Sequence, residues 1–128
     1  MNKQICNMLS NINNNQLVKK KFVLQAKKKT CEQILNVLWN EGFILGYKVL
    51  KNNPGKLKIF LKYHKGSPVI NSIKFISKPS LRVFYSLKRL WKLDSSQGVI
   101  VMSTNQGFMS DNECKKKKIG GEPFILIK

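Results

Sequence analysis

Apolar residues in the first third of the chain recur at the spacing of an α-helix. Positions i, i+3, i+4 and i+7 are apolar in two segments, which gives each segment one hydrophobic stripe. The stripes consist of Ile5, Met8, Leu9 and Ile12 in the first segment and of Cys31, Ile34, Leu35 and Leu38 in the second. An asparagine run at 13–15 ends the first predicted helix, and Gly42 supplies a left-handed stop for the second.

Around and after these helices the apolar spacing is that of β-strands. Residues 22–24 predict a short strand, and residues 43–50 and 57–63 predict two more, separated by a turn at 52–55. In the last of these strands, apolar residues alternate with lysines, which predicts a hairpin with one buried and one basic face. The predicted order of elements is therefore αβαββ.

The second half of the chain predicts mostly strands with short helices. The predicted elements are an extended run at 69–76, a strand at 81–85, a short helix at 87–93, a strand at 98–102, a polar loop at 103–107, a helix from Ser110 and a final strand at 124–127. Gly66-Ser67-Pro68 is typical of a domain boundary. We therefore predict an α+β fold with two subdomains, an N-terminal α/β unit at 1–66 and a β-rich unit at 67–128.

The charge of the chain indicates the class of its binding partner. Twenty-four Lys and Arg residues face six Asp and Glu residues, for a formal net charge of +18 in 128 residues. Such self-repulsion favours a polyanionic partner, and nucleic acid is the leading one. All but two of the cations, Arg82 and Arg89, are lysines, which together with the asparagine runs is typical of AT-rich coding sequence.

The sequence gives little support for metal, disulfide, membrane or catalytic chemistry. Its three cysteines, Cys6, Cys31 and Cys114, are far apart and form no CxxC, so we expect reduced thiols, no metal and no cofactor. His64 is the only histidine, and the carboxylates form no metal-type cluster, so we expect no enzyme. No apolar run has the roughly 18 residues of a membrane span.

Residues 102–122 combine a helix start with two kinds of polar surface. Ser110 and Glu113 have the spacing of a capping box, and Asp111 suits the helix N-terminus. Lys115 to Lys118 follow, either as a solvated basic face or as phosphate contacts. The uncharged run from Ser103 to Gln106 is either a simple polar loop or a surface for base edges and ribose hydroxyls.

These residues resemble a known family. The run from Ser103 to Asp111 resembles the S-T-x-x-G-x-M-[ST]-D signature of the eighth protein of the small ribosomal subunit, and Gly120-Gly121-Glu122 resembles its G-G-E. The segment from Ser77 to Arg82 is similar to its S-[RK]-P-x-x-R, and Glu41-Gly42-Phe43-Ile44 to its E-G-[FY]-[IL]. The similarity extends over nearly the whole chain in the same order.

The resemblance implies a structural protein of the small ribosomal subunit that binds an irregular hairpin helix in the central domain of the rRNA and supports its assembly. Its implied neighbours are the fifth, twelfth and seventeenth proteins of that subunit. The RNA-binding residues it implies, with two basic residues from the lysine run, are Ser103, Thr104, Asn105, Gly107, Gly120, Gly121, Glu122, Lys29, Arg82, Lys115 and Lys116. The chain departs from the family pattern at Asn105 and Gln106, at Phe84, where tyrosine is common, and at Lys118, where glycine often ends the last helix.

Two further expectations concern the alternative function and the location. A nonspecific nucleic-acid-binding protein outside the ribosome is the alternative that composition alone allows. Patterned sequence begins close to Met1, so we expect no presequence. The AT-rich signature then favours an organelle-encoded mitochondrial protein, with a plastid or an AT-rich bacterium as alternatives.

Overall fold

The computed structural model describes residues 3–76, 83–92 and 98–128. It divides into two compact units, Asn2–Ile70 and Asn71–Lys128. These are the N unit and the C unit, respectively.

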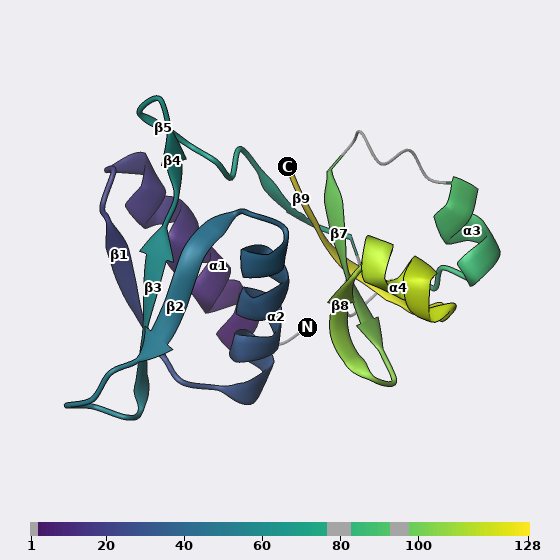
Figure 1. The fold of residues 1–128 in the computed structure, drawn as a ribbon, viewed down its shortest axis with the longest axis horizontal. Helices are drawn as coiled ribbons and strands as arrows, with labels where there is room; N and C mark the ends of the chain where they lie inside the picture. Colours follow the sequence, from purple (N-terminus) through teal and green to yellow (C-terminus); the bar gives the residue numbers. More distant parts are fainter. Residues whose placement is uncertain (1–2, 77–82, 93–97) are drawn as a thin grey trace. The chain divides into compact units, whose positions relative to one another are not determined.

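The N unit consists of two helices and a three-stranded antiparallel sheet, extended by a small hairpin (Figure 1). The sheet has the strand order β1-β3-β2. The elements are α1 (Lys3–Leu17), β1 (Phe22–Ala26), α2 (Lys29–Asn40), β2 (Ile44–Val49), β3 (Lys56–Leu61), β4 (Tyr63–His64) and β5 (Ser67–Pro68). In the turn between β4 and β5, Lys65 and Gly66 both have positive φ, as a two-residue type I′ hairpin requires.

The core of the N unit lies between the helices and one face of the sheet. The apolar stripes predicted for the two helices are buried, with every residue at 2% exposure or less. They pack with alternate residues of the strands, such as Val23, Leu57 and Ile59, which are also buried. The residues between them in the strands, including Phe22 and Leu24, lie on the opposite face, which no helix of this unit covers.

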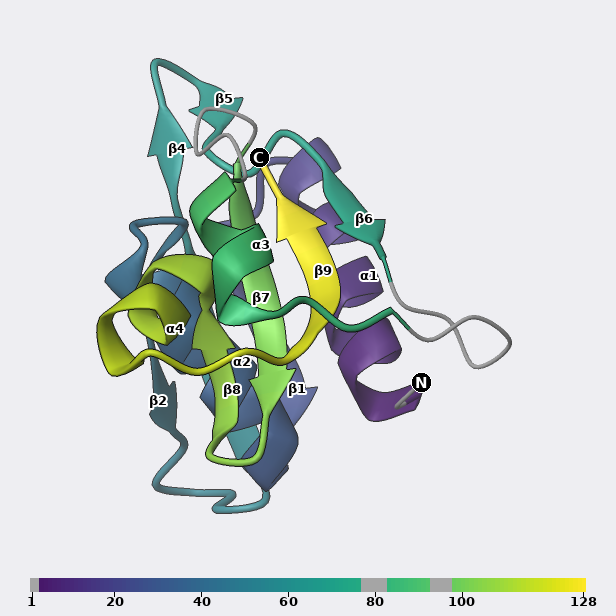
Figure 2. The ribbon, with the colours of Figure 1, turned by 90° about the vertical axis from the view of Figure 1, so that its right-hand side faces the viewer.

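The C unit is a four-stranded antiparallel sheet with two short helices (Figure 2). Its strand order is β6-β9-β7-β8, so β9, the last strand in the sequence, lies between two strands that precede it. The elements are β6 (Ile73–Phe75), α3 (Leu87–Lys92), β7 (Val99–Thr104), β8 (Gly107–Ser110), α4 (Asp111–Lys117) and β9 (Glu122–Ile127). Leu90, Met102, Met109 and Cys114 form a buried cluster that joins the helices to β7 and β8.

The predicted α+β class is confirmed, as are both N-terminal helices and the turn at 52–55. The predicted end of the first helix is wrong, because α1 continues through the asparagine run at 13–15 to Leu17. Three predictions about the C unit need correction. The extended run at 69–76 is a strand only at Ile73–Phe75, because only these residues pair with β9. In the predicted strand at 81–85, Tyr85 makes a single bridge to Gly121, while residues 81 and 82 lie outside the described part. The predicted loop at 103–107 is a tight hairpin, since Ser103 and Thr104 continue β7 and pair with β8.

Candidate nucleic-acid interface

Hydrogen bonds between side-chain and backbone groups fix the conformation of the turn in the β7–β8 hairpin. Thr104 pairs with Gly107, which leaves Asn105 and Gln106 as the two exposed turn residues. The Thr104 hydroxyl donates to the Gly107 carbonyl oxygen at 2.8 Å and accepts from the Gln106 N–H at 3.1 Å. Gly107 has φ +105°, which a side chain would disfavour. Thr104 and Gly107 therefore shape the turn, whereas Asn105 has its side chain directed to solvent.

Two glycines allow the segment before β9 to lie directly against the end of β7. A Cβ added at Gly121 would be 2.8 Å from the Ser103 carbonyl oxygen and 2.8 Å from the Thr104 methyl carbon. At Gly120 it would be 2.7 Å from the Tyr85 carbonyl oxygen. Tyr85 and Gly121 also exchange two backbone hydrogen bonds, at 2.8 and 3.0 Å. Only glycine fits such a close approach of three backbone segments.

These segments enclose a shallow, open pocket. It is lined by Phe84, Ser103, Thr104, Asn105, Ile119, Gly120, Gly121 and Glu122. Six of these eight are residues that the sequence predicted as RNA contacts, and they come from the end of β7 and the start of β9. Phe84 was not predicted. Its ring is 70% exposed, so at least one ring face is free for stacking.

Helix α4 begins as predicted and ends in an unusual conformation. The Ser110 hydroxyl accepts from the Glu113 N–H at 3.2 Å, which confirms the N-cap. The Glu113 carboxylate lies 3.5 Å from Lys117 Nζ, one helical turn further on. Lys118 closes the helix with φ 58° and ψ 44°, the left-handed conformation in which glycine is usual.

Cations and aromatic rings pair around the two helices of the C unit. Lys115 Nζ lies 5.4 Å from the centre of the Trp91 ring, and the Arg89 guanidinium lies 4.5 Å from the centre of the Tyr85 ring. Trp91 is 64% exposed and is therefore not a core residue. Arg89 and Trp91 were missed because a six-residue helix has too few positions for its apolar stripe to show which side faces solvent.

Five predicted contacts do not line this pocket: Gly107, Lys29, Arg82, Lys115 and Lys116. Lys29 is the first residue of α2 and belongs to the N unit. Arg82 lies outside the described part of the chain. Lys116 is exposed on α4, next to Lys115.

Cys114 is a buried thiol of the C unit. Burial, with smaller contributions from the neighbouring Asp111 and Glu113 carboxylates, raises the pKa of the Cys114 thiol to about 11. A thiol with this pKa is protonated at neutral pH and is a poor nucleophile. Within 3–76, 83–92 and 98–128, no three His, Cys, Asp or Glu side chains are grouped as metal ligands. No helix in the same ranges is both long and apolar enough to cross a membrane.

The C unit therefore offers three chemical functions. At the pocket, neutral hydroxyl, amide and backbone groups can donate and accept hydrogen bonds, and the exposed Phe84 ring can stack on a base. The lysines of α4, which do not line the pocket, can contact phosphates. Recognition of irregular RNA uses these same three functions.

Comparison with known proteins places the chain among ribosomal proteins. The family model described as ribosomal protein S8 matches residues 3–127. The protein named small ribosomal subunit protein uS8 of Buchnera aphidicola subsp. Cinara cedri is 41% identical over 127 residues, which cover 99% of this chain and 98% of the relative. Its namesakes are 39% identical in Wigglesworthia glossinidia brevipalpis, over 99% of this chain and 98% of the relative, and 33% identical in Dichelobacter nodosus, over 96% and 95%.

These relatives overturn the predicted location. They are bacterial proteins, so they point to a bacterial ribosome, and the prediction of a mitochondrial one is wrong. The prediction failed because a lysine- and asparagine-rich composition reports the base composition of a genome. It does not separate an organelle from an AT-rich bacterium.

Proposed function

Because the chain belongs to the ribosomal protein S8 family, we propose that it is a structural component of the small ribosomal subunit that binds the RNA of that subunit directly. The observation that carries this proposal is the shallow pocket at the β7–β8 turn, which gathers segments 103–105 and 119–122 on one surface. The proposed role is assembly and support of the RNA. It requires no catalysis, cofactor or metal.

The residues of this surface have different proposed roles in RNA binding. Ser103 and Asn105 are the side chains that supply hydrogen bonds to base edges and ribose hydroxyls. Thr104, Gly107, Gly120 and Gly121 hold the backbone in the shape that the RNA meets, and Glu122 accepts hydrogen bonds at its rim. Lys115 and Lys116 supply phosphate contacts, which set the affinity and its dependence on salt.

The same proposal includes a definite RNA target and definite neighbours. The target is an irregular internal loop in a long hairpin helix of the central domain of small-subunit rRNA. A loop of this kind splays bases into reach, whereas a regular A-form helix hides their edges in a deep groove. Contacts with the fifth, twelfth and seventeenth proteins of the subunit, and RNA contacts by Lys29 and Arg82, belong to this proposal as well.

The test compares this RNA hairpin with a plain duplex of equal length at one salt concentration. Ser103→Ala and Asn105→Ala are each expected to weaken hairpin binding by about 1–3 kcal/mol, the worth of a good readout contact, and to leave duplex binding unchanged. Ser67→Ala and Asn52→Ala are the matched controls, because both residues are exposed in the N unit, Ser67 at the start of β5 and Asn52 between β2 and β3.

The outcome separates the proposal from its alternative. Equal wild-type affinity for hairpin and duplex, with equal losses in the variants, would support a nonspecific nucleic-acid-binding protein and overturn the assignment. Recovery of the chain with small subunits from its own cells would be the independent confirmation.

A further inference from the structure

The N unit carries a sheet face that its helices leave uncovered. In the register of the sheet, Phe22 of β1 is directly opposite Phe60 of β3, and the next row on this face joins Leu24, Lys58 and Lys48. These five residues define what we call the outer face. The alternate rows, which include Val23 and Ile59, are buried on the helix side.

Apolar and aromatic groups are exposed on the outer face. Leu24 is 49% exposed and Phe22 is 43% exposed. Phe60 is half-buried, and directly opposite residues on antiparallel strands have Cβ atoms about 4.5–5.5 Å apart, so the two phenylalanines are neighbours on this face. Exposed apolar groups gathered on one face are unfavourable in water and are typical of a surface that a partner covers.

Lysine ammonium groups lie over these rings. Lys58 Nζ is 4.1 Å from the centre of the Phe22 ring and 5.4 Å from that of Phe60, and Lys48 Nζ is 5.9 Å from the centre of the Phe60 ring. The ammonium groups thus occupy the positions that a stacked base would take. A lysine side chain is long and flexible, so its ammonium can move from the ring to a phosphate when a nucleotide stacks.

The charges of the outer face are unbalanced within the protein. Lys48 and Lys58 are directly opposite each other on neighbouring strands, an arrangement that repulsion makes unfavourable. Residues 2–70 contain 13 lysines and only two acidic residues, Glu32 and Glu41. Both acids belong to α2 or its C-cap, and so to the helix layer. A negatively charged partner would remove the repulsion.

We propose that the outer face is a second RNA-binding surface, which takes unpaired nucleotides of a single strand. Bases would stack on Phe22 and Phe60, and Lys48 and Lys58 would contact the phosphates between them. A duplex fits less well, because its bases are already stacked on one another and only its phosphates are available. The proposal concerns the N unit and goes beyond the RNA contact of the C unit.

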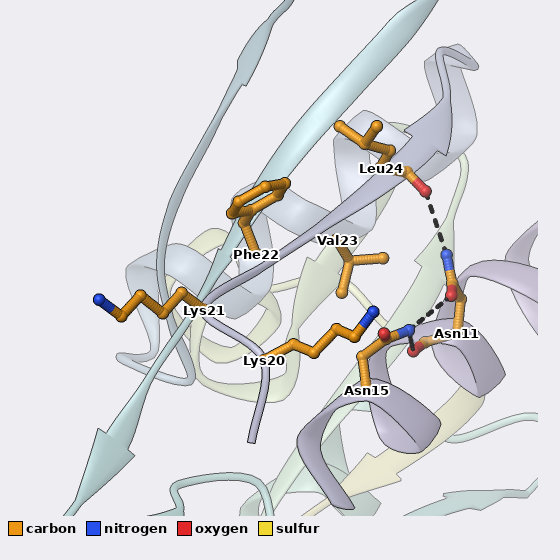
Figure 3. Close-up of a pocket in the computed structure, with 7 residues that line it drawn as sticks. All are labelled: Asn11, Asn15, Lys20, Lys21, Phe22, Val23 and Leu24. Atoms are coloured by element: carbon orange, nitrogen blue, oxygen red, sulfur yellow. Dashed lines mark hydrogen bonds between the residues drawn. The ribbon is translucent and has the colours of Figure 1, made fainter. Parts of the chain in front are cut away.

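The free edge of β1 is the competing feature, and its hydrogen bonds argue against it. Figure 3 shows the pocket between this edge and α1, with Phe22 and Leu24 on the opposite side of the strand from Val23. Asn11 Nδ2 donates to the Leu24 carbonyl oxygen at 3.1 Å and to Gln25 Oε1 at 3.2 Å. A peptide strand added here would have to displace these bonds, whereas the outer face is open.

The first experiment uses the full chain and a fluorescein-labelled, unstructured ten-nucleotide RNA with alternating A and C. The double variant Phe22→Leu, Phe60→Leu keeps the charge and most of the apolar area but removes both rings. Its affinity, measured by fluorescence anisotropy, is expected to fall at least about fivefold, with the slope of log affinity against log salt unchanged. Trp39→Leu is the matched control, because Trp39 is equally exposed but belongs to α2.

The second experiment separates a binding role of the lysines from a merely structural one. Lys48→Glu creates an opposite-charge pair with Lys58, so the melting temperature is expected to rise by about 1–4 °C. The same change is expected to weaken binding of the ten-nucleotide RNA and to reduce the salt slope. A rise in melting temperature without any loss of binding would mean that the lysines only solvate the face, and would overturn the proposal.

To distinguish the two RNA surfaces, the variants of each surface are also tested with the RNA proposed for the other surface. Ser103→Ala and Asn105→Ala are expected to leave the ten-nucleotide RNA unaffected, and excess ten-nucleotide RNA is expected not to displace the rRNA hairpin. If the phenylalanine variant binds the ten-nucleotide RNA within twofold of wild type while its melting temperature is unchanged, the outer face is not an RNA surface. That result leaves the hairpin assignment of the C unit untouched.

Discussion

The pocket at the β7–β8 turn and the outer face of the N unit are built by different means. At the turn the shape is made by the backbone, because two glycines let three segments approach within a distance that no side chain tolerates. On the outer face a regular sheet supplies only a flat frame, and the chemistry consists of side chains that stand on it. A backbone-built surface depends on the fold around it, whereas a side-chain-built surface can change without loss of stability.

The largest expected effect tests this dependence directly. Gly121→Ala would place a methyl group 2.8 Å from the Ser103 carbonyl oxygen, so the end of β7 and the start of β9 must separate. We expect a loss of about 2–3 kcal/mol in the free energy of unfolding, measured by urea titration, together with loss of binding to the rRNA hairpin. Gly55→Ala is the control, because its added Cβ meets only the Asn53 side chain at 3.6 Å and should be nearly neutral. Equal stability of the two variants would contradict the backbone-built description.

A second prediction compares the buried thiols of the two units. Burial raises the pKa of Cys31 in the N unit, and at Cys114 burial, Asp111 and Glu113 raise it to about 11. The folded state therefore favours the neutral Cys114 thiol. The resulting stabilisation is fully present below the ordinary thiol pKa of 9.0 and is lost as the pH rises toward 11.

Between pH 8 and pH 11 the free energy of unfolding should therefore fall by about 1–2 kcal/mol through Cys114. Cys114→Val keeps the apolar volume and removes the proton, so its stability should fall less over the same range. If urea titrations of wild type and Cys114→Val show the same pH dependence, the Cys114 thiol does not contribute to the pH dependence of the free energy of unfolding.

A third, smaller effect concerns the cap that connects the hairpin to α4. Ser110→Ala removes the hydrogen bond from the Glu113 N–H and should cost about 1 kcal/mol. Since α4 carries Lys115 and Lys116, the proposed phosphate contacts, the salt slope for the RNA hairpin should also decrease. Ser86→Ala removes a longer bond, 3.3 Å to the Arg89 N–H in the shorter helix α3, and should cost less. Thermal melts of the two variants, run side by side, provide the measurement.

The smallest effect has the opposite sign. Lys118 and Lys65 both have a left-handed backbone, one at the end of α4 and one in the β4–β5 turn. Replacement of either lysine by glycine removes the clash of the Cβ and should stabilise the chain by about 0.5–1 kcal/mol. Lys117→Gly, inside α4, should instead destabilise it by about 1 kcal/mol. Destabilisation by Lys118→Gly would show that the lysine side chain contributes more than the strain costs.

The features that the sequence predicted correctly are those set by local chemistry. The stripe from Ile5 to Ile12 and the Ser110 cap each depend on residues within two helical turns, so spacing alone identifies them. The hairpin at 103–107 was missed because Ser103 and Thr104 have no apolar signal of a strand. They are extended because residues 107, 108 and 122 pair with them.

For the same reason the two surfaces were predicted to different extents. The polar run and the glycine pair identified most of the residues that line the turn pocket, through their resemblance to a family. Phe84 and Trp91 were missed because the residues next to an aromatic residue in the sequence do not show whether its side chain is buried or exposed. The outer face was missed as a site because the row that joins Phe22 and Phe60 exists only in the register of two strands 38 positions apart in the sequence.

The position of β9 in its sheet also has a consequence for how the protein is made. Strands β6 and β7 leave the ribosome before β9, yet β9 lies between them, so the sheet of the C unit has a vacant central place until residues 122–127 are synthesised. The N unit comprises residues 2–70, so all of it is synthesised before β9, and compact units of a chain generally fold in the order of synthesis. The pocket at the β7–β8 turn is completed by Gly120, Gly121 and Glu122, so under the proposed function a nascent chain that lacks them would not yet bind the rRNA hairpin.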